Sequence, residues 1–186
     1  QCKNNLKQFG LALHNYHETA NMFPPLEVQT QAFMSGGNNN WGGNAGNYLT
    51  LILPYIDQAP AYATINFGAA YNAAANLNAF KAKYPAYLCP SNPVQDQLFN
   101  NTHIVHYYAM IGGSSGQPGG TERIQWEIGT NNGNEIWKGM VVHSSKGNMR
   151  DITDGSRNTG AIKEAAGYHE ATKQWTTNGE GRTGMV

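Results

Sequence analysis

The sequence predicts an α+β fold in which a long N-terminal helix packs on an antiparallel β-sheet, with extra short helices and long Gly/Asn-rich loops. Three observations lead to this prediction. The first twenty residues have helical periodicity, several later segments are rich in β-branched and aromatic residues, and short turns separate those segments. Helices first and strands later, joined by short turns, are typical of an α+β domain with an antiparallel sheet.

The N-terminal helix is predicted from an apolar stripe whose members recur at alternating steps of four and three: Cys2, Leu6, Phe9, Leu13, Tyr16 and Ala20. Pro24 and Pro25 end this pattern, because proline has no N–H to donate. We therefore expect a helix from about 2 to about 20, packing through Leu6, Phe9, Leu13 and Tyr16. Gly10 should leave room for a close neighbour. Because no Ser, Thr, Asp or Asn caps the first turn, we expect this helix to continue a longer one.

Residues 21–86 are predicted to be rich in loops and short helices. The run MSGGNNNWGGNAGN (34–47) should form an exposed loop anchored by Trp41. Apolar residues at helical spacing in 47–62 predict a short buried helix, interrupted near Pro54. Asn76 is expected to cap a further small helix over 77–84, which ends before Pro85.

Residues 87–186 are predicted to be rich in strands. The strand candidates are the segments 102–113, 123–129, 135–144 and 159–166. Residues 113–120 should form a turn or loop, and residues 146–160 a one-turn helix followed by a tight turn. No internal repeat or linker divides the sequence, so we predict a single domain over 1–186.

Composition and charge exclude some classes of partner. The 186-residue chain has 12 basic and 12 acidic residues and no net charge. No electrostatic footprint for nucleic acid or an anionic membrane is present, so neither is expected as a partner. No apolar run is long enough to cross a bilayer, and no signal peptide is recognisable. We expect either a cytosolic protein or one whose targeting segment has been removed.

The two cysteines, Cys2 and Cys89, are far apart in the sequence and form no C-x-x-C motif. Two interpretations remain open. They can be two buried thiols, or they can form a Cys2–Cys89 disulfide in an oxidising compartment, which is the interpretation we favour. Closing so long a loop would stabilise the fold by roughly 4 kcal/mol in the chain-entropy model.

Metal-site candidates are sparse. His14 and His17 share a helical face without a third ligand, and His103 and His106 should point to opposite faces of a strand. Neither pair matches a zinc signature, so we expect solvated or hydrogen-bonded histidines. Asp151 and Asp154, beside Gly155, could supply oxygens to calcium. The preferred interpretation is that these carboxylates cap local backbone N–H groups.

Catalytic motifs are also lacking. The sequence contains no nucleophile elbow, Walker loop or dinucleotide fingerprint, and Glu122 and Glu127 are too generic to be an acid/base pair. A sugar-stacking platform could be built from tyrosines and the tryptophans Trp41, Trp126, Trp137 and Trp175. Core and loop anchoring explains most such aromatic residues. We therefore expect no enzyme and no cofactor, apart from the weak calcium candidates Asp151 and Asp154.

Four motifs stand out along the sequence: CKNNLKQFGLALHNYHETANMFPP, LTLILPYIDQAPAY, YLCPSNP and MRDITDGSRNTGAIKEAA. Together they resemble a large bacterial family of exported type IV pilin-like or pseudopilin proteins, once labelled a solute-binding family, that carry a prepilin-type cleavage and methylation segment. The last motif contains the family's turn motif, here Asp151, Asp154, Gly155 and Asn158. Ser156–Arg157–Asn158 replaces the family's usual Thr-Ser-Asn, and the family's closing His and Asp-Gly segment is not found.

The resemblance implies a pilin-like architecture, with an apolar helix half preceding Gln1 that is anchored in the membrane before assembly. It implies a non-catalytic subunit on an extracellular filament or secretion pseudopilus, with other pilin-like subunits as partners through the N-terminal helix. The alternative is an extracellular carbohydrate- or solute-binding module, whose partner would be a glycan or surface ligand. This binding-module alternative predicts a pocket lined by aromatic rings.

Overall fold

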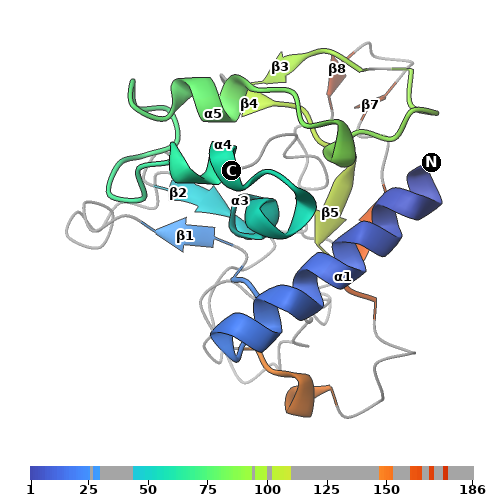
Figure 1. Ribbon diagram of the computed structural model, residues 1–186. Helices are drawn as coiled ribbons and strands as arrows, with labels where there is room; N and C mark the ends of the chain where they lie inside the picture. The colour runs from blue at the N-terminus through green and yellow to red at the C-terminus, as the bar shows by residue number, and fades with distance from the viewer. Residues whose placement is uncertain are drawn as a thin grey trace, which may run out of the picture.

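The computed structural model describes residues 1–25, 27–29, 44–93, 95–99, 102–109, 147–152, 160–164, 168–169 and 174–175. Within these residues, one long helix crosses the face of a body built from short helical segments and two-stranded antiparallel ribbons (Figure 1). This mixture of helix and antiparallel strand agrees with the predicted α+β class. The predicted strands at 123–129 and 135–144 lie outside the described residues.

The helices are α1 (Cys2–Ala20), α3 (Tyr48–Ile52), α4 (Ala59–Ala63) and α5 (Leu77–Lys81), with 3-10 turns η2 (Leu53–Ile56), η3 (Pro85–Tyr87) and η4 (Met149–Asp151). The strands are β1 (Glu27–Gln29), β2 (Asn44–Asn47), β3 (Leu98–Phe99), β4 (Thr102–His103), β5 (Tyr107–Ala109), β6 (Ile162–Glu164), β7 (Tyr168–His169) and β8 (Gln174–Trp175). They pair in antiparallel ribbons as β1–β2, β3–β4, β5–β6 and β7–β8.

Helix α1 has the predicted bounds, and its first turn has no side-chain cap, as the sequence indicated. At its other end Asn21 adopts a left-handed conformation with φ 55°, which stops the helix before the prolines are reached. Phe9, Ala12 and Leu13 are the buried residues of the helix. A Cβ added at Gly10 would meet no atom of the described residues within 4 Å, so the expected room is present and no described atom fills it.

The segment around β2 corrects two predictions. Residues Asn44–Asn47, predicted as the end of an exposed loop, form a strand paired with β1, so strands do not all follow the helices. The strand leads directly into α3, where the Asn47 side chain accepts a hydrogen bond from the Leu49 N–H at 2.9 Å. As predicted, the helical run is interrupted at Pro54, where it continues as the 3-10 turn η2.

Asn76 occupies the predicted cap position of α5, but its side chain does not cap the helix. The fully buried amide turns back to the preceding loop instead. Its Oδ1 accepts from the Asn66 N–H, and its Nδ2 donates to the carbonyls of Asn66, Ala69 and Ala70. One side chain therefore satisfies the backbone of a loop that has no strand or helix to do so.

The predicted continuous strand at 102–113 is broken within the described residues. The Ile104 N–H donates to the Gln97 carbonyl, which extends the β3–β4 register by one residue pair. The His106 N–H instead donates to the Tyr87 carbonyl at 2.9 Å before β5 begins. The chain therefore changes its pairing partner between β4 and β5, which belong to different ribbons.

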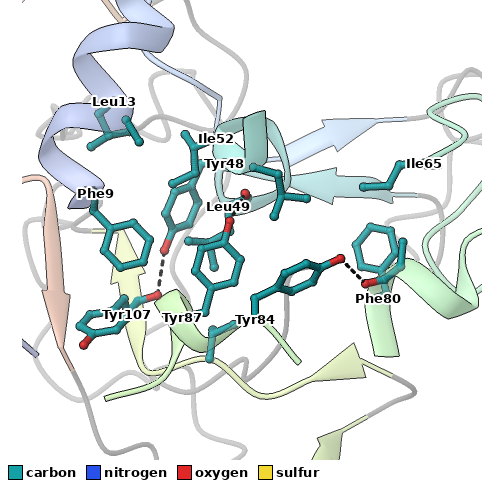
Figure 2. Close-up of a cluster of buried hydrophobic side chains, with 14 of the residues drawn as sticks. Phe9, Leu13, Tyr48, Leu49, Ile52, Ile65, Phe80, Tyr84, Tyr87 and Tyr107 are labelled. Carbon is teal, nitrogen blue, oxygen red and sulfur yellow. Dashed lines mark hydrogen bonds between the residues drawn. The ribbon is translucent and has the colours of Figure 1, made fainter. Parts of the chain in front are cut away.

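The core beneath α1 is rich in tyrosine (Figure 2). The Phe9 ring lies 5.6 Å from the Tyr87 ring and 4.9 Å from the Tyr107 ring, measured between centroids. The Tyr87 hydroxyl donates to the Leu49 carbonyl at 2.6 Å, and the Tyr48 hydroxyl donates to the Tyr107 carbonyl at 3.0 Å. These rings fill the core, and their hydroxyls connect α3 to η3 and to β5.

Gly46→Ala should lower the free energy of unfolding by roughly 1–3 kcal/mol. Gly46 has φ +148°, and an added Cβ would lie 2.6 Å from Oγ1 of the fully buried Thr50. The matched control is Gly10→Ala, which should raise stability by about 0.5–1 kcal/mol because Gly10 lies in a helix with open space around it. Urea denaturation measures both; equal effects would contradict the steric argument.

Candidate functional site

The first turn of α1 is attached covalently to the middle of the chain. A disulfide joins Cys2 to Cys89, with the two Cα atoms 4.9 Å apart and a sequence separation of 87. This confirms the disulfide interpretation over the two free thiols. Cys89 is buried and Cys2 is partly exposed. The bridge therefore stands at the edge of the core, where α1 begins.

Polar groups surround this bridge. The Asn5 amide donates to the Leu88 carbonyl at 3.0 Å and to the Tyr107 hydroxyl at 3.2 Å. The Cys89 N–H donates to Nδ1 of His106, at 2.9 Å. We call the group of Cys2, Asn5, Cys89, Tyr107 and Glu164 the disulfide corner. It joins α1, the chain after η3, β5 and β6.

Glu164 is brought to the corner by strand pairing, because it lies opposite Tyr107 in the β5–β6 ribbon. Its exposed carboxylate has an oxygen within 4.8 Å of both sulfur atoms. Burial raises the pKa of the Tyr107 hydroxyl, and the nearby Glu164 carboxylate raises it further. The hydrogen bond from Asn5 acts in the opposite direction.

The far end of α1 is hydrogen-bonded to the segment that begins η4. Nε2 of His17 lies 3.1 Å from Oδ1 of Asn148 and 3.3 Å from the Met149 backbone nitrogen. The Asn148 amide also donates to the carbonyl of Asn21, which is the residue that ends the helix. Figure 1 shows η4 beside this end of α1. His17 is thus partly buried and hydrogen-bonded, in line with the expectation for the histidines.

The predicted turn motif is only partly described. Asp151 lies in η4, the one-turn helix that the sequence predicted, and its carboxylate accepts from the Asn148 N–H at 2.9 Å. This is the local capping that the preferred interpretation assigned to it. Asp154, Gly155 and Asn158 lie outside the described residues, so calcium binding by Asp151 and Asp154 stays a prediction.

The other predicted candidates fall in different places. His103 and His106 are both buried, and His103 contacts Asp96 with its Nε2 at 3.2 Å. The break between β4 and β5 removes the basis for placing the two rings on opposite faces. His14 is exposed. Trp41, Trp126 and Trp137 lie outside the described residues, as do Glu122 and Glu127, and only the backbone of Trp175 is described.

The predicted packing face of α1 lies against the core to differing degrees. Phe9 and Leu13 are buried, and Leu6 is partly buried against the same cluster. Tyr16 is partly buried, and its ring lies edge-on to Tyr55 at 6.1 Å. On the outer side, Leu11 is 65% exposed.

Within the described residues, no helix has the length and apolar character needed to cross a membrane.

Sequence reasoning missed Asn5, Asn148 and Glu164, which hold or border the two ends of α1. Asn5 lies beside the apolar stripe, one turn after Cys2. This position could have indicated that its side chain lies near the bridge. Asn148 and Glu164 come from segments more than a hundred residues away. No local pattern around them indicates the contact.

Removing the bridge with Cys2→Ala and Cys89→Ala together should lower the free energy of unfolding by roughly 4–5 kcal/mol, because the closed loop spans 87 residues. Ser91→Ala, at an exposed position near the bridge, is the control and should change stability by less than about 0.5 kcal/mol. Urea denaturation at neutral pH makes the measurement. A loss below about 1 kcal/mol would show that the crosslink adds little to this fold.

Stability should fall as the pH rises above about 10, the ordinary tyrosine pKa. Burial raises the pKa of Tyr108 to about 12 and raises that of Tyr87 well above its ordinary value. Between pH 10 and about 12 the tyrosines of the unfolded chain have lost protons that Tyr108 and Tyr87 retain in the folded chain. The free energy of unfolding therefore falls as the pH rises. In Tyr108→Phe the decline between pH 10 and about 12 should be shallower. Urea denaturation at several pH values, with tyrosinate absorbance as a second signal, tests this; an unchanged slope would contradict it.

Comparison with protein-family models matches residues 1–185 to SBP_bac_10, described as a protein of unknown function (DUF1559). No curated protein matches the chain, and no solved structure matches it either. The matched region includes α1, both cysteines of the disulfide corner and the β5–β6 ribbon. The chain therefore belongs to the SBP_bac_10 (DUF1559) family.

Proposed function

We propose that this chain is the head of a pilin-like or pseudopilin subunit, displayed on an extracellular filament or secretion pseudopilus, with no catalytic role. The observation that supports the proposal is that α1 is buried on one side and exposed on the other. Phe9 and Leu13 are buried in the head, whereas Leu11 is 65% exposed on the other side of the helix. A helix held at both ends in this way can present its outer face to a neighbouring subunit.

The outer face of α1 also has room for close approach. Gly10 adjoins Leu11, and a Cβ added at Gly10 would meet no described atom within 4 Å. A glycine beside an exposed leucine allows a partner's backbone to come near and bury the leucine side chain. The occupant we propose for this face is another pilin-like subunit.

The disulfide supports an exported location. Disulfides form and persist in oxidising compartments and are rare in the cytosol. The motifs shared with exported pilin-like proteins include the Cys2 and Cys89 segments, so both observations favour the same compartment. Before assembly, an apolar helical segment encoded upstream of Gln1 would anchor the subunit in the membrane.

Leu11→Gln in the full-length protein should reduce its recovery in the sheared or assembled surface fraction at least about tenfold, since the change removes an apolar contact between subunits. Leu98→Gln is the matched control, because Leu98 is also a large exposed apolar residue, at 55%. Both variants should keep the unfolding free energy of the parent. Equal recovery of the two variants would contradict assembly through this face.

Export is tested by labelling intact cells with a maleimide. If the head is exported, the Cys2 and Cys89 thiols react only after reduction, because the bridge has formed. The control is the same protein expressed without any segment upstream of Gln1, whose cysteines should react directly in the cytosol. Direct labelling of the full-length protein, or its recovery in the cytosol, would overturn the proposal.

A further inference from the structure

The disulfide corner gathers three side chains that can bind a metal ion. Sγ of Cys2, Sγ of Cys89 and a carboxylate oxygen of Glu164 all lie within 4.8 Å of one another. They come from α1, from the chain after η3 and from β6. The disulfide joins the two sulfur atoms, and the pairing of β5 with β6 adds the carboxylate. Within the described part of the chain, no other three His, Cys, Asp or Glu side chains meet in this way.

We propose that reduction of the bridge turns this corner into a site for one Zn²⁺, with Cys2, Cys89 and Glu164 as ligands. A phosphine reductant supplies two electrons and becomes its oxide with an oxygen from water. The S–S bond breaks, and each sulfur takes up one proton. Zn²⁺ then displaces both thiol protons into the buffer and forms two Zn–S bonds and one Zn–O bond.

The ligand set and its spacing fit zinc. Zinc binds thiolate at about 2.3 Å and carboxylate oxygen at about 2.0–2.2 Å, usually with tetrahedral geometry. Those bond lengths place neighbouring ligand atoms roughly 3.6–3.8 Å apart. The carboxylate oxygen lies within 4.8 Å of both sulfur atoms. Once the S–S bond is broken, the site requires the two sulfur atoms to move apart and the carboxylate to approach, which are side-chain movements. Because Glu164 is exposed, the fourth position is open to water.

The surroundings hold two of the ligands in place without the bridge. Cys89 is buried, and its N–H donates to His106 Nδ1 at 2.9 Å. Cys2 lies in the first turn of α1. Asn5, one turn further along, fastens this end of α1 to the Leu88 carbonyl. Reduction therefore leaves the two sulfur atoms close together.

The test uses phosphine-reduced protein and Co²⁺ as a spectroscopic probe, followed by displacement with Zn²⁺. We expect one Co²⁺ per chain, thiolate-to-cobalt charge-transfer absorption, and no binding to the oxidised protein. Glu164→Gln should weaken Zn²⁺ affinity at least about tenfold. Lys163→Gln is the matched control, at the exposed neighbouring position of β6, and should leave the affinity unchanged.

A thermal melt of the same reduced proteins separates a folded site from binding to an unfolded chain. Zn²⁺ should raise the melting temperature of the reduced parent and of Lys163→Gln more than that of Glu164→Gln. The proposal is overturned if the reduced protein binds no Co²⁺ or stays unfolded in Zn²⁺. Equal affinity of Glu164→Gln and the parent would also overturn it, because the carboxylate would then not be a ligand.

Discussion

The burial of tyrosine hydroxyls against backbone carbonyls is the constraint on which the rest of this structure depends. Tyr87 and Tyr48 are buried, and a buried hydroxyl without a partner would cost roughly 1–3 kcal/mol. Each donates instead to a carbonyl on another segment, Leu49 for Tyr87 and Tyr107 for Tyr48. The rings therefore supply apolar volume and fix the relative positions of α3, η3 and β5.

Helix α1 is positioned on that aromatic layer. Phe9 packs against the rings of Tyr87 and Tyr107. The position of the helix is therefore set by the same tyrosine side chains that connect the other elements of the core. Its two ends are then fixed by different chemistry. A covalent bridge holds the first turn, and neutral hydrogen bonds from Asn148 and Met149 hold the last. The end near Cys2 is consequently sensitive to redox conditions, and the other end is not.

The assembly proposal and the zinc proposal concern different surfaces of the same helix. The assembly proposal concerns the outer face around Leu11, and the zinc proposal concerns the corner around Cys2. The two can be separated by substitution, because Leu11 is not a ligand and Glu164 does not lie on α1. If both hold, reduction would exchange one crosslink at the base of α1 for another, and the helix would keep its position on the head.

Local pattern in the sequence was sufficient for α1, for the helical run interrupted at Pro54, for η4 and for β6, because periodicity, proline and short turns act on neighbouring residues. The disulfide was one of two open interpretations, and proximity in the fold resolved it. The sequence did not reveal β2, the break between β4 and β5 or the loop role of Asn76. These depend on which distant backbone groups need a partner, and only tertiary packing decides that. The same reason applies to Glu164, which reaches the two sulfur atoms solely because β6 pairs with β5.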